Sequence, residues 1–153
     1  MSAPPNPYTV RRIVKWGECD PAGIVYTPRF LDWVLEAAES FFAEVVGVDW
    51  FQLNQKYGLG SPSVSVKLDF RKPIQFGQPF TIEVLVRRLS RSTITYAMRG
   101  RNGAHELCFE AELVSCIVNH AQMKSVAIPD DIRQPILAYQ AATAAVLEKD
   151  AAA

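Results

Sequence analysis

Hydrophobic and polar positions change their spacing near residue 60 of this 153-residue chain. Before that point, from Pro28 to Val46, apolar side chains recur at helical spacing and cover most of the cylinder, leaving one narrow polar line. A helix this apolar must be nearly surrounded by other structure. Thr27 is placed to act as its N-cap. A shorter helix is expected over residues 49–57, with Asp49 as its cap.

After residue 62 the polar and apolar side chains alternate, which is typical of strands with one buried face. Residues 63–70 follow a strict period of two. Further strands are expected over residues 8–16, 79–89, 92–100, 105–119 and 124–128. Asn102-Gly103 favours a type I′ hairpin turn, because both residues tolerate positive φ angles. An Ala-rich helix is expected over residues 135–149.

The order of these elements is one strand, a long helix, a short helix and about four antiparallel strands. The economical way to bury the long helix is a strongly curved antiparallel sheet wrapped around it, which is an α+β architecture. The length fits a single domain over residues 1–153. Within it we expect residues 1–7 to be a flexible N-terminus and residues 136–153 to be a C-terminal helical extension.

Composition narrows the function classes. Sixteen basic and sixteen acidic residues cancel, which argues against nucleic-acid and membrane-surface partners. Residues 1–7 lack the basic and apolar regions of a signal peptide. Three cysteines without CxxC spacing fit a reduced cytoplasmic protein better than a disulfide framework. His105 and His120 show no metal-site spacing with the cysteines, so no metal is expected.

Candidate chemistry lies in the turn Asp20-Pro21-Ala22-Gly23, just before the long helix. Free N–H groups and the dipole at a helix N-terminus favour negative charge nearby. A carboxylate in this position can act as an oxygen nucleophile or as a base for water. The alternative is that Asp20 only stabilises the turn through a bond to the backbone downstream. Cys19 is a weaker candidate nucleophile, because no histidine is near it in sequence to activate the thiol.

The stretch Glu18-Cys19-Asp20-Pro21-Ala22-Gly23-Ile24-Val25-Tyr26 resembles the signature of the 4-hydroxybenzoyl-CoA thioesterase family, whose members have the hot-dog fold. Weaker matches are Pro28, Trp33, Gly60-Ser61-Pro62 and Thr81-Ile82-Glu83. The resemblance therefore covers about residues 8–130. It implies a curved antiparallel sheet around one long central helix, in agreement with the α+β architecture expected from the periodicity.

The same resemblance implies an acyl-CoA thioesterase that hydrolyses an aromatic acyl-CoA thioester to free acid and CoA, without a cofactor. Asp20 would attack the thioester carbonyl or activate water, and the Thr27 N–H would polarise the thioester oxygen. Substrate contacts are expected from Tyr26, Leu35, Gly60, Ser61 and Arg91. The resemblance also implies a homotetramer, a dimer of dimers, with each active site at a subunit interface.

Four points stay open. Leu35 follows Trp33 by two positions, where the 4-hydroxybenzoyl enzyme has an acidic residue for the substrate hydroxyl, so leucine predicts an acyl group with an apolar tip. Arg91 suits a CoA phosphate, but a solvated strand face explains it equally well. Glu36 is the reserve catalytic acid. A non-catalytic acyl-CoA-binding hot-dog module and a hot-dog hydratase are the alternative functions.

Overall fold

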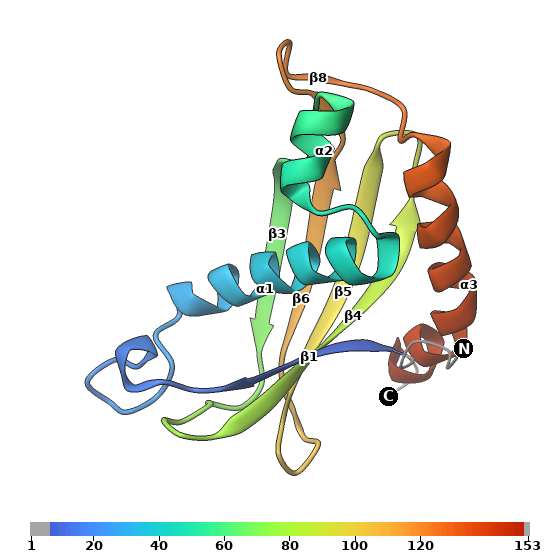
Figure 1. The fold of residues 1–153 in the computed structure, drawn as a ribbon. Coiled ribbons are helices and arrows are strands. Elements are labelled where there is room, and N and C mark those ends of the chain that lie inside the picture. Colours follow the sequence, from blue (N-terminus) through green and yellow to red (C-terminus); the bar gives the residue numbers. More distant parts are fainter. Residues whose placement is uncertain (1–6, 152–153) are drawn as a thin grey trace.

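A five-stranded antiparallel sheet wraps around one long helix in the computed structural model, which describes residues 7–151 (Figure 1). The strand order is β1-β4-β5-β6-β3. These strands are β1 (Tyr8–Ile13), β3 (Ser63–Phe70), β4 (Pro79–Leu89), β5 (Thr93–Asn102) and β6 (Leu107–Cys116). A second small sheet contains β2 (Leu59–Gly60), β7 (Val118–Asn119) and β8 (Lys124–Ser125). The expected α+β hot-dog architecture is confirmed.

The central helix has the expected bounds. It begins as α1 (Pro28–Phe41) and continues as the π-helical turn η2 (Phe42–Val46), which ends at Gly47 with a φ of 83°. Its buried side chains are Phe30, Trp33, Val34, Ala37, Ala38 and Phe41. They pack against the sheet, and each large apolar side chain removed from water contributes roughly 2 kcal/mol. One face of the helix is therefore buried against the sheet, whereas Leu31 on the other side is 38% exposed, so the helix is less enclosed than its composition indicated.

The short helix α2 (Trp50–Tyr57) also forms where the sequence predicted it. Asp49 accepts the N–H of Gln52 at 2.7 Å, and Gln52 Oε1 accepts the N–H of Asp49 at 3.1 Å. This reciprocal capping box satisfies two backbone donors that the helix itself leaves free. Gly58 ends the helix with a φ of 65°.

Strand β3 lies at an edge of the large sheet, where β6 is its only neighbour among the described strands. Its last residue, Phe70, meets Phe30 of α1 at 4.9 Å between ring centroids. Val64 and Val66, in contrast, are 61% and 38% exposed. The protomer thus presents a sheet edge that carries apolar side chains, which natural proteins usually cover.

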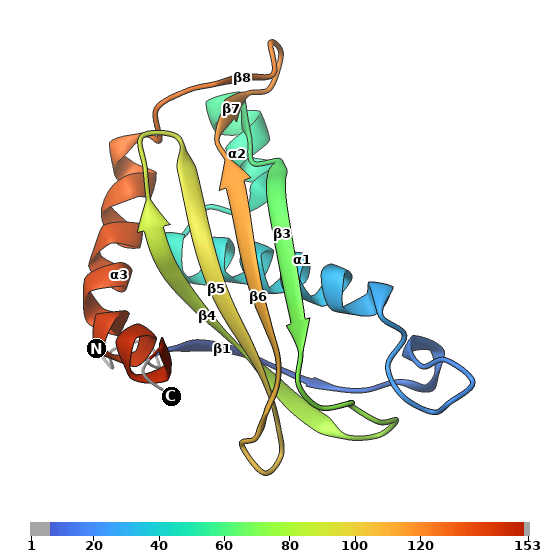
Figure 2. The same cartoon turned by 180° about the vertical axis from the view of Figure 1, so that it is seen from behind.

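The C-terminal helix begins earlier than expected. Helix α3 runs from Asp130 to Ala151, and Pro135 lies inside it. The expectation rested on the Ala-rich composition of residues 135–149. Here the carbonyl of Pro129 accepts two N–H groups of the first turn, so the helix is already formed when it reaches Pro135. Helix α3 lies beside β4 (Figures 1 and 2), and Tyr139 donates its O–H to the Val84 carbonyl.

The first strand is shorter than expected, ending at Ile13 instead of Trp16. Residues after it turn into the 3₁₀ helix η1 (Trp16–Glu18). The carboxylate of Glu18 accepts the N–H of Lys15 at 2.9 Å and thereby stabilises this turn. A side-chain hydrogen bond has overridden the strand pattern.

The prediction of a type I′ turn at Asn102-Gly103 is wrong. Strand β5 continues to Asn102, whose Oδ1 accepts the N–H groups of Ala104 and Glu106, each at 3.0 Å. The positive φ of the connection falls on His105, at 62°, and not on Gly103. Likewise, the expected strand 105–119 is divided into β6 and β7, which belong to different sheets.

Candidate functional site

The loop between η1 and α1 carries the Asp-Pro-Ala-Gly turn and is closed at its base. Cys19 and Val25 form an antiparallel bridge, and the carbonyl of Glu18 accepts the N–H of Tyr26 at 2.9 Å. The neighbouring segment supports the loop, since the carbonyl of Ile74 accepts the N–H of Val25 at 2.9 Å. The turn is thus held in place by backbone hydrogen bonds on two sides.

Asp20 lies half-buried in this loop. Its Oδ1 accepts the N–H of Ala22 at 2.8 Å, and its carbonyl accepts the N–H of Gly23 at 3.0 Å. Gly23 has a φ of 78°, a conformation that favours glycine. The other oxygen of the carboxylate accepts no hydrogen bond from residues 7–151. Asp20 therefore stabilises the turn with one oxygen and leaves the second available.

Thr27 precedes the first residue of α1. Its φ of −47° and ψ of −45° are already helical, and its side chain makes no capping hydrogen bond. Thr27 therefore occupies the N-cap position, as expected, but its side chain does not cap the helix. Within the described part of the chain the N–H of Thr27 donates no hydrogen bond. It is one of the free donors at the helix N-terminus, where a negative charge is stabilised.

A pocket of about 300 Å³ opens beside Thr27. Its walls are formed by Ile24, Val25, Thr27, Phe30, Phe70, Arg71, Lys72, Pro73 and Ile74. Most of this lining is apolar, and two of the lining residues, Arg71 and Lys72, are cationic. Asp20 is on the same loop as Ile24 and Val25 but does not line the pocket.

The other residues singled out from the sequence lie in two groups. Tyr26 is 53% exposed and adjacent to Thr27, whereas Leu35 packs partly buried against the core and does not line the pocket. The second group, at the opposite end of the sheet, contains Gly60, Ser61 and Arg91.

The two groups are far apart in one protomer. Strand β3 has eight residues and runs from the Gly60 end to the Phe70 end. At about 3.3 Å per residue it separates the two ends by roughly 26 Å. A single chain therefore does not bring Gly60, Ser61 and Arg91 to Asp20 and Thr27.

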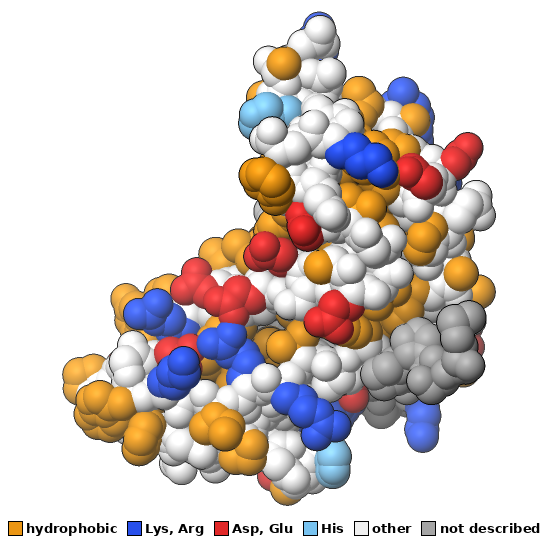
Figure 3. All heavy atoms as spheres, viewed as in Figure 1, with side chains coloured by type: hydrophobic (Ala, Val, Ile, Leu, Met, Phe, Trp, Pro, Cys, Tyr) orange, Lys and Arg blue, Asp and Glu red, His pale blue; other side chains and the backbone are white. Residues whose placement is uncertain are grey.

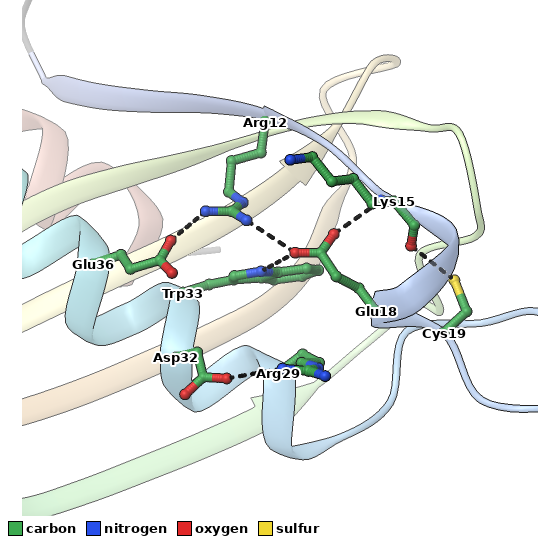
Figure 4. A network of polar contacts seen from close by, with 8 residues as sticks. All are labelled: Arg12, Lys15, Glu18, Cys19, Arg29, Asp32, Trp33 and Glu36. Atoms are coloured by element: carbon green, nitrogen blue, oxygen red, sulfur yellow. Dashed lines mark hydrogen bonds and ion pairs between the residues drawn. The ribbon is translucent and has the colours of Figure 1, made fainter.

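Glu18 ties the loop to α1, a role that the sequence reasoning missed (Figure 4). Its carboxylate accepts the Nε1–H of Trp33 at 3.1 Å and pairs with Arg12 at 2.9 Å. Arg12 also pairs with Glu36 and lies over the Trp33 ring, 5.4 Å from its centroid. Burial disfavours the charge of Glu18, but the hydrogen bonds outweigh it and lower the pKa of its carboxyl.

We expect Glu18→Gln to lower the free energy of unfolding by roughly 1–2 kcal/mol at neutral pH, because the amide keeps the shape but loses the charge. Since the folded pKa of Glu18 is lowered, its contribution is complete above the ordinary value of 4.5 and is lost as the pH falls through the folded value. Urea unfolding at about pH 7 and about pH 3 measures both effects.

The matched control for Glu18 is Asp69→Asn. Asp69 pairs with Lys67 at 3.5 Å, but both side chains are largely exposed. Exposed pairs contribute little, so this variant should keep wild-type stability at both pH values. A Glu18→Gln protein as stable as the wild type at neutral pH would contradict the anchoring role.

Hydrophobic side chains gather at the outer end of the lobe formed by this loop (Figure 3). Trp16 of η1 and Phe76, which are 67% and 54% exposed, meet edge to face at 5.5 Å between ring centroids. Residues 7–151 contain no cluster of three His, Cys, Asp or Glu side chains suited to a metal ion. Over the same range no helix is long and apolar enough to cross a membrane.

Sequence comparisons identify the family to which this chain belongs. The family model described as "Thioesterase-like superfamily" matches residues 14–136. The 4-hydroxybenzoyl-CoA thioesterase of Pseudomonas sp. (strain CBS-3) is 29% identical over 86 residues, which are 56% of this chain and 61% of the relative. This chain therefore spans less than two thirds of that relative's length. The 1,4-dihydroxy-2-naphthoyl-CoA hydrolase of Thermosynechococcus vestitus is 30% identical over 132 residues, which are 83% of this chain and 88% of the relative.

Solved structures share the fold. A thioesterase superfamily protein from Jannaschia sp. CCS1 is 27% identical, with a TM-score of 0.80 over 90% of this chain and 96% of the other. A Staphylococcus aureus protein solved in complex with CoA superposes with a TM-score of 0.86 at 11% identity, covering 94% of this chain and 89% of the other. The family match covers most of the chain, and the resemblance read from the sequence is confirmed: the protein belongs to the thioesterase-like superfamily, a family of thioester hydrolases.

Proposed function

We propose that this protein is an acyl-CoA thioesterase that hydrolyses an aromatic acyl-CoA thioester to the free acid and CoA. The observation that carries the proposal is that Thr27, whose N–H is unengaged, lines a largely apolar pocket beside the loop of Asp20. The relatives named for 4-hydroxybenzoyl-CoA and 1,4-dihydroxy-2-naphthoyl-CoA support an aromatic acyl group.

In the proposed mechanism the thioester oxygen accepts the N–H of Thr27. As negative charge develops on that oxygen, the N-terminus of α1 stabilises it. Asp20 then acts in one of two ways: its carboxylate attacks the carbonyl carbon to give an anhydride that water hydrolyses, or it takes a proton from the attacking water. In both routes the carbon–sulfur bond breaks, the CoA sulfur leaves and is protonated, and one water is consumed.

The proposed assembly is a homotetramer, a dimer of dimers, whose first interface is the edge of β3. A two-fold axis through this edge pairs two β3 strands antiparallel. Gly60 and Ser61 of the partner subunit then approach the Phe70 end of β3, where Thr27 and the pocket lie. This arrangement supplies the site with the residues that one protomer holds at the far end of its sheet, and it covers Val64 and Val66.

Thiol release from a panel of aryl and alkyl CoA esters tests the activity. Turnover of at least one aromatic ester, without added metal, is the expected result. CoA binding without thiol release from any ester would instead favour the non-catalytic binding module. Addition of water across an enoyl-CoA would favour the hydratase.

Although Leu35 does not line the pocket within one protomer, we propose that it sets the preference for the acyl group in the assembled enzyme. A hydroxyl buried beside leucine has no partner, which costs roughly 1–3 kcal/mol. We therefore expect kcat/KM for 4-hydroxybenzoyl-CoA to be no higher than for benzoyl-CoA, and Leu35→Asp to shift the ratio toward the hydroxylated ester. Leu137→Asp, at a surface leucine of α3, is the control and should leave the ratio unchanged. A wild-type enzyme that strongly favours the hydroxylated ester would overturn this assignment.

A cytoplasmic location is also proposed. Cys19, Cys108 and Cys116 are free, which fits a reducing compartment. Fractionation of the native host with a specific antibody tests the location. Recovery of the protein outside the cytoplasm would overturn it.

A further inference from the structure

The charged residues that line the pocket beside Thr27 are all cationic, and the mechanism above does not use them. Its lining contains two cationic residues, Arg71 and Lys72, and no aspartate or glutamate. The rest of the wall is apolar apart from Thr27. The chain as a whole has sixteen basic and sixteen acidic residues, so the excess of positive charge at this pocket is local. An apolar wall lowers the dielectric and strengthens the attraction for an anion.

The backbone holds both residues in place. The N–H groups of Arg71 and Lys72 donate to one acceptor, the carbonyl of Cys108 in β6, at 2.7 and 3.0 Å. Cys108 is fully buried, so its carbonyl is part of a rigid strand. The two side chains therefore start from a fixed position directly after β3.

The present partners of these cations lie outside the pocket and are exchangeable. Arg71 pairs with Glu110 at 2.9 Å, and Lys72 pairs with Glu106. All four side chains are between 36% and 56% exposed. Solvent-exposed pairs of this kind contribute little to stability, so replacing one carboxylate by a ligand anion has a low cost.

We infer that Arg71 and Lys72 bind an anionic group of the substrate at the mouth of this pocket. The inference rests on the proposed function, because the thioester is taken to lie at the Thr27 N–H. A guanidinium binds carboxylate and phosphate oxygens in a two-pronged geometry, and an ammonium adds a point charge. The anion is either a carboxylate on the acyl group or a phosphate of CoA, and both sources share this chemistry.

Three thioesters separate the two sources. Benzoyl-CoA carries only phosphates, 4-carboxybenzoyl-pantetheine carries only a carboxylate, and benzoyl-pantetheine carries neither. The variants are Arg71→Gln, Lys72→Gln and the double variant. Arg11→Gln is the matched control, because Arg11 is an exposed cation on β1, at the opposite edge of the sheet, and does not line the pocket.

For the ester that carries the bound anion, KM should rise roughly tenfold in each single variant and more in the double variant, because a charge-assisted hydrogen bond is lost. KM for benzoyl-pantetheine, and all constants of Arg11→Gln, should stay at wild-type values. A rise for benzoyl-CoA alone identifies the phosphate, and a rise for 4-carboxybenzoyl-pantetheine alone identifies the acyl carboxylate.

A double variant whose KM stays within about twofold of wild type for all three esters overturns the inference. If the wild type hydrolyses no ester, the proposed function fails, and calorimetric binding of CoA and of benzene-1,4-dicarboxylate still tests the anion site. Affinity for one of them should then fall in the double variant. Equal affinities of wild type and double variant for both probes would refute the site independently of turnover.

Discussion

Replacing Asp20 with asparagine is expected to lower kcat by about 10²- to 10⁴-fold, because the variant loses the proposed nucleophile or base. The fold should stay intact, since an asparagine oxygen can still accept the N–H of Ala22 that Asp20 accepts at 2.8 Å. Thermal unfolding should therefore be unchanged within experimental error. Binding of a CoA ester should also persist, because Asp20 does not line the pocket.

Asp32→Asn is the control for Asp20. Asp32 is an exposed carboxylate on α1 that pairs with Arg29 at 3.6 Å, so it lies near the site in sequence but has no assigned role. Its kcat should match that of the wild type. An Asp20→Asn enzyme that keeps a third or more of the wild-type kcat would show that the reaction does not use Asp20.

Much of the fold could be predicted because the spacing of apolar residues differs between strands and helices. The strict alternation of residues 63–70 marked a strand, and the apolar run from Pro28 to Val46 marked a helix that other structure had to cover. Local hydrogen bonds decided the points that failed. The side chain of Asn102 caps two backbone N–H groups and so changes the hairpin, and no period of hydrophobicity reports such a bond.

Less of the candidate site than of the fold could be predicted from the sequence. Asp20 could be singled out because it stands in a long motif, and its turn-stabilising bond was considered as an alternative. The sequence assigns Glu18 no role beyond its place in the motif, because its partners Arg12 and Trp33 lie 6 and 15 positions away. In the sequence, Arg71 and Lys72 look like two solvated residues after a strand. Their place at the pocket of Thr27 follows only from the fold.

The separation of the predicted residues has a physical reason. Gly60 and Ser61 precede β3, whereas the pocket lies where β3 ends, so their distance is set by the length of the strand. A motif match does not show whether two residues meet within one chain or across a subunit interface. The exposed Val64 and Val66 on the strand between them indicate the second possibility.

Replacing Val66 with lysine is accordingly expected to abolish the dimer and most of the activity. Val66 stands near the middle of β3, so a two-fold axis through this edge brings the two copies close together. Two lysines there would repel each other and leave unpaired charge in the interface, which is how natural edge strands avoid pairing. Light scattering should give a tetramer for the wild type and a lower mass for the variant, because only the second interface of the dimer of dimers would remain.

Activity should fall with assembly, since the variant site lacks the partner's Gly60 and Ser61. A loss on the order of 10²-fold is expected when positioning groups are removed. Ile13→Lys is the matched control, because Ile13 is 64% exposed at the end of β1, on the opposite edge of the sheet. It should keep both mass and activity. A monomeric wild type with full turnover in dilute solution, or a Val66→Lys enzyme of unchanged mass and rate, would rule out a site shared across β3.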